Sequence, residues 1–402
     1  MKVRISKSAL SGTVSAPPSK SMAHRMLISA GLCKGESKVH GIAPSEDILA
    51  TLDCLKQIGA SYTYDGNTVI INGAANKETE GMRELYCRES GSTLRFFIPL
   101  CLLNDKQTVL SGTEKLLSRP LSVYESICKA QGIQYNNDGK AITLKGTLTS
   151  GSYKIQGNIS SQFISGLMFA LPLLPGDSTI DIIPPIESCS YINLTIQALG
   201  EFGVNVRWLD ERTLFIPGGQ QYTPREVTVE GDYSNGAFFE ALNCLGDSVT
   251  IEGLRSDSIQ GDRVYRDYFP MLEKGTPTIH LADCPDLGPV LFALSAAKHG
   301  GVFTGTRRLR IKESDRGAAM AQELKKFGVS VRIEEDTIVV YPAEFHAPKE
   351  TLYGHNDHRI VMSLAILLTK TGGIIDGAEA VKKSMPDFFE RIIQLGAKVE
   401  EL

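Results

Sequence analysis

A sixfold internal repeat limits the folds open to this 402-residue chain more than any other feature of its sequence. Each repeat contains a helical segment that ends in glycine and is followed by residues of alternating polarity, as in LDCLKQIGASYTYDGNTVIING. The glycines at these ends are Gly59, Gly132, Gly203, Gly275, Gly328 and Gly396, at intervals of 73, 71, 72, 53 and 68 residues. Glycine ends a helix readily because it can adopt the left-handed conformation, and Asp65-Gly66 and Asp138-Gly139 favour tight turns between paired strands.

An earlier helix in each repeat is apolar on nearly every side, which predicts burial, whereas the second helix is more amphipathic. The first helices start at about Lys20, Gly91, Ser161, Asn235, Leu287 and Asp357. Six βαβαββ units of this length predict an α/β (α+β) protein that folds as two globules of three units, with the sheets outside and the apolar helices inside. Because the interval from Gly275 to Gly328 is about 20 residues shorter than its neighbours, we expect the fourth unit to lack most of its strand pair.

The composition excludes several classes of protein. Hydrophobic residues make up 42% and charged residues 22%, as in folded globular proteins, so disorder is excluded. The formal net charge of -4, from 42 Lys and Arg against 46 Asp and Glu, provides no basic field for nucleic acid. The eight cysteines form no Cys-x-x-Cys pair, which favours reduced thiols. No apolar run is long enough to span a membrane, so we expect a cytoplasmic protein that is not membrane-bound.

Basic residues recur at the predicted helix starts. The first helices carry Lys20, Arg25, Arg95 and Arg359 at or near their starts, and the second helices carry Arg119, Lys312, Arg316 and Lys383. A helix N-terminus disfavours cations unless an anion is also bound there, and Arg and Lys bind phosphate and carboxylate. The shared place of these residues predicts a pocket for substrates with several negative charges. Taken singly, polar residues at a helix start can be ordinary caps, and a basic residue can be a solvated surface charge.

Two carboxylates among these basic residues are candidates for acid–base catalysis. They are Asp286 in DCPDLGP and Glu313 in RIKESDR. The alternatives are that Asp286 caps a helix and that Glu313 pairs with Arg316 three residues later, a contact worth about 0.3 kcal/mol. His355 and His358 have the spacing of metal ligands, but the sequence offers no third ligand. Phosphate-loop and dinucleotide-binding motifs are absent, which disfavours ATP and NAD.

The chain resembles the 5-enolpyruvylshikimate-3-phosphate synthase family of enolpyruvyl transferases. The most specific stretches are PPSKSMAHR at 17–25, SGSTLR at 90–95, SSQF at 160–163, IKESDR at 311–316, NDHR at 356–359 and KSMPDFF at 383–389. The resemblance implies two inverse-alpha-beta-barrel domains, residues 1–14 plus 230–402 and residues 15–229, joined by two strands with the site in the cleft between them. It also implies transfer of the enolpyruvyl group of phosphoenolpyruvate to the 5-hydroxyl of shikimate 3-phosphate, with release of phosphate, in aromatic amino acid biosynthesis. It implies no cofactor and no metal, and we expect a monomer.

The resemblance also implies roles for individual residues. The catalytic residues would be Asp286, Glu313 and Lys20, with Asp286 as the base and Glu313, helped by Lys20, as the proton donor. The residues that would hold shikimate 3-phosphate are Ser21, Arg25, Ser160, Ser161, Gln162, Ser188, Asp286 and Lys312. Those that would hold phosphoenolpyruvate are Lys20, Gly91, Arg119, Gln162, Arg316, Arg359 and Lys383.

The chain departs from the family pattern at three positions near these motifs. Glu89 stands where the family usually has Asn, Phe96 where Pro is common, and Arg308 where Asn often contacts the substrate. A carboxylate beside a phosphate pocket weakens anion binding unless it points away. We therefore expect these departures, Glu89 above all, to affect the affinity for phosphoenolpyruvate and for its analogue glyphosate.

Two alternatives remain open. UDP-N-acetylglucosamine enolpyruvyl transferase shares the repeat and phosphoenolpyruvate, but it typically has a reactive Cys where this chain has Glu114. The second alternative is a catalytically silent homologue that only binds anions, which would be expected to have lost Lys20, Asp286 or Glu313. All three residues are present.

Overall fold

The protein is described by a computed structural model that covers residues 1–74 and 81–402. These residues form two compact units: unit 1 comprises Met1–Pro17 and Gly231–Leu402, and unit 2 comprises Pro18–Glu230. The family resemblance places the two domain boundaries at residues 14–15 and 229–230. In the structure, the units divide at Pro17–Pro18 and Glu230–Gly231. Each unit has its own hydrophobic core. None of the described helices is long and apolar enough to cross a membrane.

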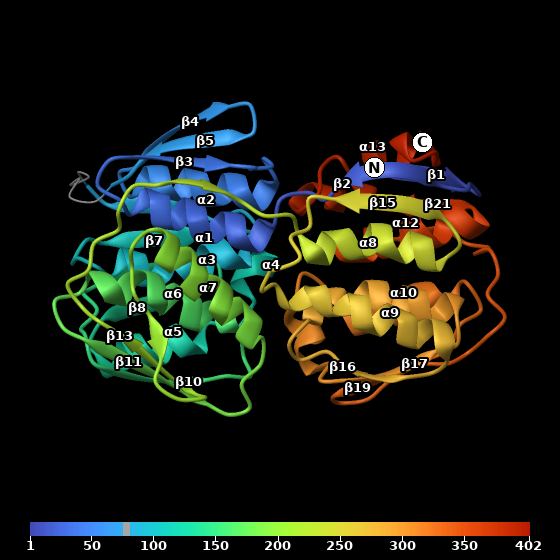
Figure 1. Ribbon diagram of the computed structural model, residues 1–402. Coiled ribbons are helices and arrows are strands. Elements are labelled where there is room, and N and C mark those ends of the chain that lie inside the picture. The colour runs from blue at the N-terminus through green and yellow to red at the C-terminus, as the bar shows by residue number, and fades with distance from the viewer. Residues whose placement is uncertain (75–80) are drawn as a thin grey trace. The chain divides into compact units, whose positions relative to one another are not determined.

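Unit 2 contains the first three repeats (Figure 1). The first comprises α1 (Lys20–Gly31), β3 (Glu36–His40), α2 (Glu46–Gln57), β4 (Ser61–Asp65), β5 (Thr68–Asn72) and β14 (Glu226–Thr228). The second comprises β6 (Arg83–Tyr86), α3 (Gly91–Cys101), β7 (Thr108–Ser111), α4 (Glu114–Leu117), α5 (Ser122–Ala130), β8 (Gln134–Asn137) and β9 (Ala141–Lys145). The third comprises β10 (Ser152–Gln156), α6 (Ser161–Ala170), η1 (Leu171–Leu173), β11 (Ser178–Ile183), α7 (Cys189–Glu201), β12 (Arg207–Trp208) and β13 (Thr213–Ile216).

Unit 1 contains the other three repeats. The fourth comprises β2 (Ser11–Ser15), α8 (Tyr233–Cys244), β15 (Ser248–Glu252), η2 (Gly261–Val264) and α9 (Tyr265–Lys274). The fifth comprises β16 (Thr278–His280), η3 (Pro285–Leu287), α10 (Gly288–Ala297), β17 (Gly301–Thr304), η4 (Arg307–Ile311), α11 (Arg316–Lys325), β18 (Val331–Ile333) and β19 (Thr337–Val340). The sixth comprises β20 (Leu352–Tyr353), α12 (His358–Thr371), β21 (Gly373–Asp376), η5 (Ala378–Lys383), α13 (Phe388–Gln394), β22 (Lys398–Glu401) and the N-terminal β1 (Lys2–Ser6).

The described residues form six sheets, one for each repeat. Five have four strands in a common order, shown by β6-β7-β9-β8, in which the first pair is parallel and the next two pairs are antiparallel. The sheet of the fourth repeat has only the parallel pair β15 and β2. This confirms that the fourth repeat lacks its antiparallel strand pair.

The burial of the helices also follows the predicted pattern. The six first helices, α1, α3, α6, α8, α10 and α12, are buried over most of their length. Among the second helices, α5 and α9 expose most of their residues. Figure 1 shows the sheets of each unit lying outside its helices. The first helices begin within two residues of the predicted starts. The interior of each unit is therefore built from apolar helices, as the sequence predicts.

The helix-ending glycines follow the prediction with one exception. Five of the six have φ between 69° and 107°, the left-handed region that favours glycine. Gly275 instead has a φ of 170°, which is extended backbone. The chain continues from Gly275 through Pro277 into β16 without a strand pair, so it runs on in an extended conformation where the other repeats reverse.

The packing of α6 against α3 depends on Gly166. A Cβ atom at this position would lie 2.5 Å from the backbone oxygen of Arg95 and 2.3 Å from the hydroxyl of Tyr124. Tyr124 is fully buried and donates to that same Arg95 oxygen at 2.7 Å, so neither neighbour can move away easily.

We predict that Gly166→Ala lowers the free energy of unfolding by about 1–3 kcal/mol through overpacking. Gly200 in α7 provides a matched control, because a Cβ there would meet nothing within 4 Å. Gly200→Ala should raise stability by about 0.5–1 kcal/mol through the better helix propensity of alanine. Urea denaturation of both variants checks this, and equal effects of the two substitutions would contradict it.

Candidate active site

In unit 2, the predicted site residues gather at the N-termini of its first helices. Lys20, Gly91 and Ser161 are the first residues of α1, α3 and α6. The preceding serines are N-caps: the side chains of Ser19, Ser90 and Ser160 accept hydrogen bonds from Met22 N, Thr93 N and Gln162 N. Ser160, a predicted substrate ligand, therefore also has the capping role that the sequence leaves open.

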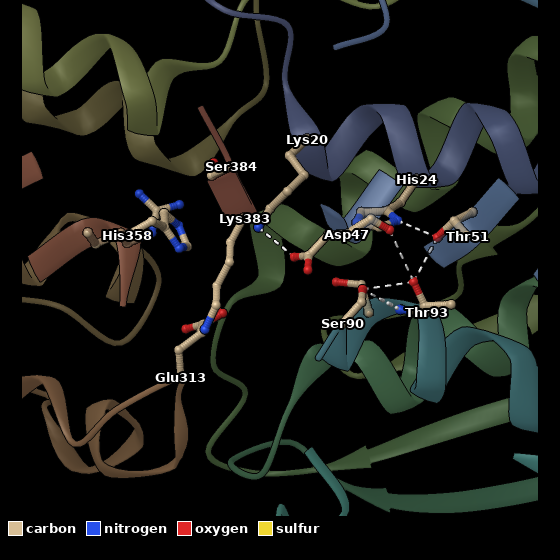
Figure 2. A network of polar contacts seen from close by, with 12 residues as sticks. Lys20, His24, Asp47, Thr51, Ser90, Thr93, Glu313, His358, Lys383 and Ser384 are labelled. Atoms are coloured by element: carbon tan, nitrogen blue, oxygen red, sulfur yellow. Dashed lines mark hydrogen bonds and ion pairs between the residues drawn. The ribbon is translucent and has the colours of Figure 1, made fainter. Parts of the chain in front are cut away.

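The ammonium group of Lys20 forms an ion pair with Asp47. Lys20 Nζ lies 2.8 Å from Asp47 Oδ2, and the two side chains are only 15% and 13% exposed (Figure 2). Because the helix dipole disfavours a cation at the start of α1, the carboxylate of Asp47 offsets that unfavourable interaction. Asp47 was not predicted as a site residue from the sequence. An acidic residue in the first turn of a helix, as Asp47 is in α2, is common and does not by itself indicate a site.

Gly91 lies among cationic and polar groups. A Cβ atom on Gly91 would be 2.8 Å from Arg119 Nη1, 3.2 Å from Arg95 Nη1 and 3.8 Å from Gln162 Oε1. Arg95 Nη1 donates to Gln162 Oε1 at 2.7 Å, and Gln162 Nε2 donates to Ser92 Oγ at 2.8 Å. Within the described residues, Nε and Nη2 of the buried Arg119 have no hydrogen-bond partner. The absence of a side chain at Gly91 thus lets these donors, which are suited to an anion, approach the start of α3 closely.

Arg25 is held by hydrogen bonds within unit 2. Its Nε donates to Thr195 Oγ1 at 2.8 Å, its Nη1 to the backbone oxygen of Ser21 at 2.7 Å, and its Nη2 to that of Tyr191 at 3.0 Å. Burial lowers the pKa of Arg25 to about 10. Phe96, one of the departures from the family pattern, is fully buried and places its ring 5.3 Å from this guanidinium group.

Ser188 lies near the same cluster in sequence and structure. It is buried, immediately precedes α7, and has a left-handed φ of 59°. Tyr191 in the first turn of α7 offers its backbone oxygen to Arg25, so α7 connects Ser188 to the Arg25 cluster. The structure therefore brings the unit 2 candidates into two neighbouring groups, one around Gly91 and one around Arg25.

In unit 1, three cations surround Asp286. Its Oδ1 accepts from Arg316 Nη1 at 2.8 Å and from Lys312 Nζ at 3.2 Å, and its Oδ2 accepts from Arg359 Nη2 at 3.0 Å. Burial alone would raise the pKa of Asp286, but the positive charges of Arg359, Lys312 and Arg316 hold it well below its usual range. Asp286 is therefore ionised at neutral pH.

Arg316 connects the carboxylates of this cluster. It is 1% exposed and also donates from Nη2 to Glu313 at 2.7 Å and from Nε to Asp357 at 2.9 Å. Burial alone would lower the pKa of Arg316, but Asp357, Glu313 and Asp286 raise it. The contact between Glu313 and Arg316 thus belongs to a buried network and is not the isolated surface pair considered from the sequence.

The pKa of Lys312 is lowered by burial and by neighbouring arginines and raised by neighbouring carboxylates. Burial lowers its pKa, the charges of Arg316 and Arg308 lower it further, and Asp286 opposes them. Arg308, another departure from the family pattern, is buried in η4. This arginine therefore weakens the hold of Lys312 on its proton.

The segment before α12 has a strained backbone that Glu323 stabilises. His355 and Asn356 both have left-handed φ values, 50° and 52°, which are unfavourable for residues other than glycine. The buried Glu323 accepts hydrogen bonds at 2.9 Å from His355 Nε2 and from the backbone nitrogen of Tyr353. Lys383 Nζ donates to the backbone oxygen of Asn356 at 2.6 Å. Glu323 was not predicted from the sequence, because it has no motif around it.

The spacing of His355 and His358 does not produce a metal site in the structure. His355 binds Glu323, and His358 is buried in the first turn of α12. Among residues 1–74 and 81–402, no group of three His, Cys, Asp or Glu side chains is arranged to hold a metal ion.

We predict that Asp286→Asn lowers the free energy of unfolding at neutral pH by about 3 kcal/mol, because the buried Arg316 and Arg359 and the partly exposed Lys312 lose their shared anion. The pKa of Asp286 is depressed in the folded protein, so its contribution is fully present above the unfolded-state pKa of about 3.9 and is lost as pH falls towards the folded value. The stability gap between wild type and variant should therefore narrow below about pH 4. Urea denaturation at several pH values measures this gap, and a gap that widens in acid would contradict the assignment.

Comparisons with known proteins identify the family of this chain. The sequence model of the family described as EPSP synthase (3-phosphoshikimate 1-carboxyvinyltransferase) matches residues 5–392. The chain is 41% identical over 425 residues to the 3-phosphoshikimate 1-carboxyvinyltransferase of Clostridium kluyveri, covering 99% of this chain and 98% of the relative. It is 39% identical over 429 residues to that of Clostridium novyi, with 99% and 98% covered.

Solved structures share the fold. EPSP synthase from Acinetobacter baumannii superposes with a TM-score of 0.80 over all of both chains at 22% identity. The enolpyruvyl transferase NikO from Streptomyces tendae does so with a TM-score of 0.81 at 14% identity, covering 99% of this chain and 98% of the other. These likenesses confirm the predicted fold class. From its sequence matches over nearly its whole length, the chain belongs to the EPSP synthase (3-phosphoshikimate 1-carboxyvinyltransferase) family.

Proposed function

We propose that this protein transfers the enolpyruvyl group of phosphoenolpyruvate to the 5-hydroxyl of shikimate 3-phosphate and releases phosphate, a step in aromatic amino acid biosynthesis. The observation that carries the proposal is the buried cluster around Asp286, in a chain that matches the family from residue 5 to residue 392. A carboxylate kept ionised among three cations is suited to chemistry on anionic substrates.

The reaction is an addition followed by an elimination. In the addition, a base removes the proton of the 5-hydroxyl, its oxygen bonds to the carbon of phosphoenolpyruvate that carries the phosphate, and an acid protonates the methylene carbon. In the elimination, the methyl group returns a proton to the group that protonated the methylene carbon, the double bond re-forms, and the carbon–oxygen bond breaks to release phosphate. We assign the base to Asp286 and the proton donor to Glu313, with Lys20 assisting.

The cations around Asp286 provide a way to adjust its basicity. Arg359, Arg316 and Lys312 hold the pKa of Asp286 well below its usual range, and a carboxylate with so low a pKa is a weak base. The substrates carry phosphate and carboxylate groups that compete for the same donors. When a substrate anion draws these cations away, the proton affinity of Asp286 rises, so basicity is coupled to substrate binding.

The remaining candidates divide between the two substrates. For phosphoenolpyruvate, we assign the space beside Gly91, the donors of Arg119, and Lys20, Arg316, Arg359 and Lys383. For shikimate 3-phosphate, we assign Ser21, Arg25, Ser160, Ser161, Ser188 and Lys312, with Gln162 contacting both ligands. Two donors of Arg119, which have no hydrogen-bond partner among the described residues, support the assignment of Arg119 to an anion.

The proposal extends to the setting in which the protein works. All eight cysteines are free thiols, as expected in a reducing compartment, which supports a cytoplasmic location. The negative formal charge of -4 argues against nucleic acid as a partner. We propose a monomeric enzyme that requires no cofactor.

A phosphate-release assay tests the proposed function. With phosphoenolpyruvate present, we expect release on addition of shikimate 3-phosphate and none on addition of UDP-N-acetylglucosamine. The reverse result would favour the UDP-N-acetylglucosamine enolpyruvyl transferase, and no release with either acceptor would favour a silent anion-binding homologue. Glu114 at the start of α4 supports the first outcome, because the alternative transferase typically has a reactive cysteine there.

A single substitution tests the role of Asp286. Asp286→Asn should lower kcat by about 100-fold or more, because the amide cannot accept the proton of the hydroxyl. Its Kd for shikimate 3-phosphate, measured by calorimetry, should stay close to the wild-type value. A kcat within a few-fold of wild type would contradict the assignment of Asp286 as the base.

A further inference from the structure

A chain of hydrogen bonds lies buried in unit 2 beneath the residues assigned to phosphoenolpyruvate. His24 Nδ1 is 2.7 Å from Thr51 Oγ1, Thr51 Oγ1 is 2.8 Å from Thr93 Oγ1, and Thr93 Oγ1 donates to Ser90 Oγ at 2.8 Å. All four side chains are at most 1% exposed. Figure 2 shows this relay, by which we mean His24, Thr51, Thr93 and Ser90, crossing from α1 through α2 to α3.

The relay repeats, one helical turn deeper, the contact made by Lys20 and Asp47. His24 follows Lys20 by four residues on α1, and Thr51 follows Asp47 by four residues on α2. Residues four apart lie on the same face of a helix. The ion pair and the bond between His24 and Thr51 therefore connect α1 and α2 at two successive turns. Two such contacts fix the spacing of the two helices and their rotation relative to each other.

The third helix joins the relay at its N-terminus. Ser90 is the N-cap of α3 and accepts from the backbone nitrogen of Thr93 at 3.2 Å. Gly91, the residue after Ser90, begins the helix, and the nitrogens of Arg119 and Arg95 converge beside it. The relay thus connects the helix start that carries Lys20 to the helix start that carries Gly91.

The direction of the hydrogen bonds follows from the state of His24. Burial lowers the pKa of His24 to about 3, so the ring is neutral and carries one N–H group. Within the described part of the chain, His24 Nε2 has no hydrogen-bond partner. A buried N–H without an acceptor is rarer than a buried acceptor without a donor, so the proton belongs on Nδ1 and is donated to Thr51. Thr51 then donates to Thr93, and Thr93 to Ser90.

We propose that His24, Thr51 and Thr93 are positioning residues for phosphoenolpyruvate, an inference that rests on the proposed function. They touch no reacting atom. Their role is to hold the starts of α1, α2 and α3 at a fixed spacing, so that Lys20 and the donors beside Gly91 meet one anion together. Small displacements of such groups weaken binding and catalysis steeply.

Thr51→Val tests the proposal, because valine has the shape of threonine but cannot pass on the hydrogen bond. We expect the KM for phosphoenolpyruvate to rise about tenfold, while the KM for shikimate 3-phosphate stays within about twofold. Thr51→Ser keeps the hydroxyl and should restore the wild-type KM. Because His24 is neutral throughout, the rise should be the same at about pH 6 and about pH 8.

Ser29→Ala provides the matched control. Ser29 is a fully buried hydroxyl on the same helix α1, and its Oγ has no hydrogen-bond partner within the described residues. Its removal should leave both KM values unchanged. Should Thr51→Val fail to fold, as judged by circular dichroism, Thr93→Val breaks the relay at the next bond and should give the same selective rise.

Each remaining outcome contradicts a distinct claim. If both KM values rise together, or only the melting temperature falls, the relay has a structural role alone. If neither valine variant changes the KM for phosphoenolpyruvate, the positioning role is wrong. A wild-type protein that releases no phosphate from this substrate pair contradicts the proposed function, and the positioning role with it.

Discussion

The burial of cations beside carboxylates, at places where a helix dipole disfavours positive charge, is the constraint on which the rest of the structure depends. Lys20 at the start of α1 and Arg316 at the start of α11 both occupy such places, and each is compensated by a carboxylate from another element. Burying a charge without a partner is costly, so Asp47 and Asp357 are as necessary as the cations they hold. Arg119 differs from these cations, because within the described residues two of its nitrogens have no hydrogen-bond partner.

The repeat explains why these charges gather. Each first helix is apolar and buried, so its polar start is the part that reaches the edge of the core. Duplication places several such starts in equivalent positions, and each can then acquire its own chemistry. In unit 2 the first-helix starts supply hydroxyl caps and Gly91, whereas in unit 1 they supply Asp286, just before α10, and Arg359 in the first turn of α12. The starts of second helices add Arg316 to the cluster around Asp286.

The fold could be predicted from the sequence largely because its signals are local. Helix-ending glycines and apolar helices recur at similar spacings, Asp-Gly turns mark two of the strand pairs, and the missing strand pair of the fourth repeat shows as a shortened interval. The partners of the site could not be found in the same way. Asp47 lies 27 residues from Lys20 and Glu323 lies 32 from His355, and no periodicity relates them. The extended Gly275 was missed for a similar reason, because its conformation depends on the path that the chain takes after the helix.

The shortened fourth repeat shows which parts of a repeat the site needs. That repeat has lost its antiparallel strand pair, yet the start of α8 is complete: Asp232 caps the helix by accepting from Asn235 N and also accepts from the hydroxyl of Ser234. Ser234 Oγ in turn accepts from Arg359 Nη2 at 3.0 Å, which helps to hold the arginine against Asp286. The strand pair lies on the outer side of a repeat, far along the chain from its first helix start. The helix starts carry the charged and capping groups of the cluster, so the fourth repeat contributes to it without an outer strand pair.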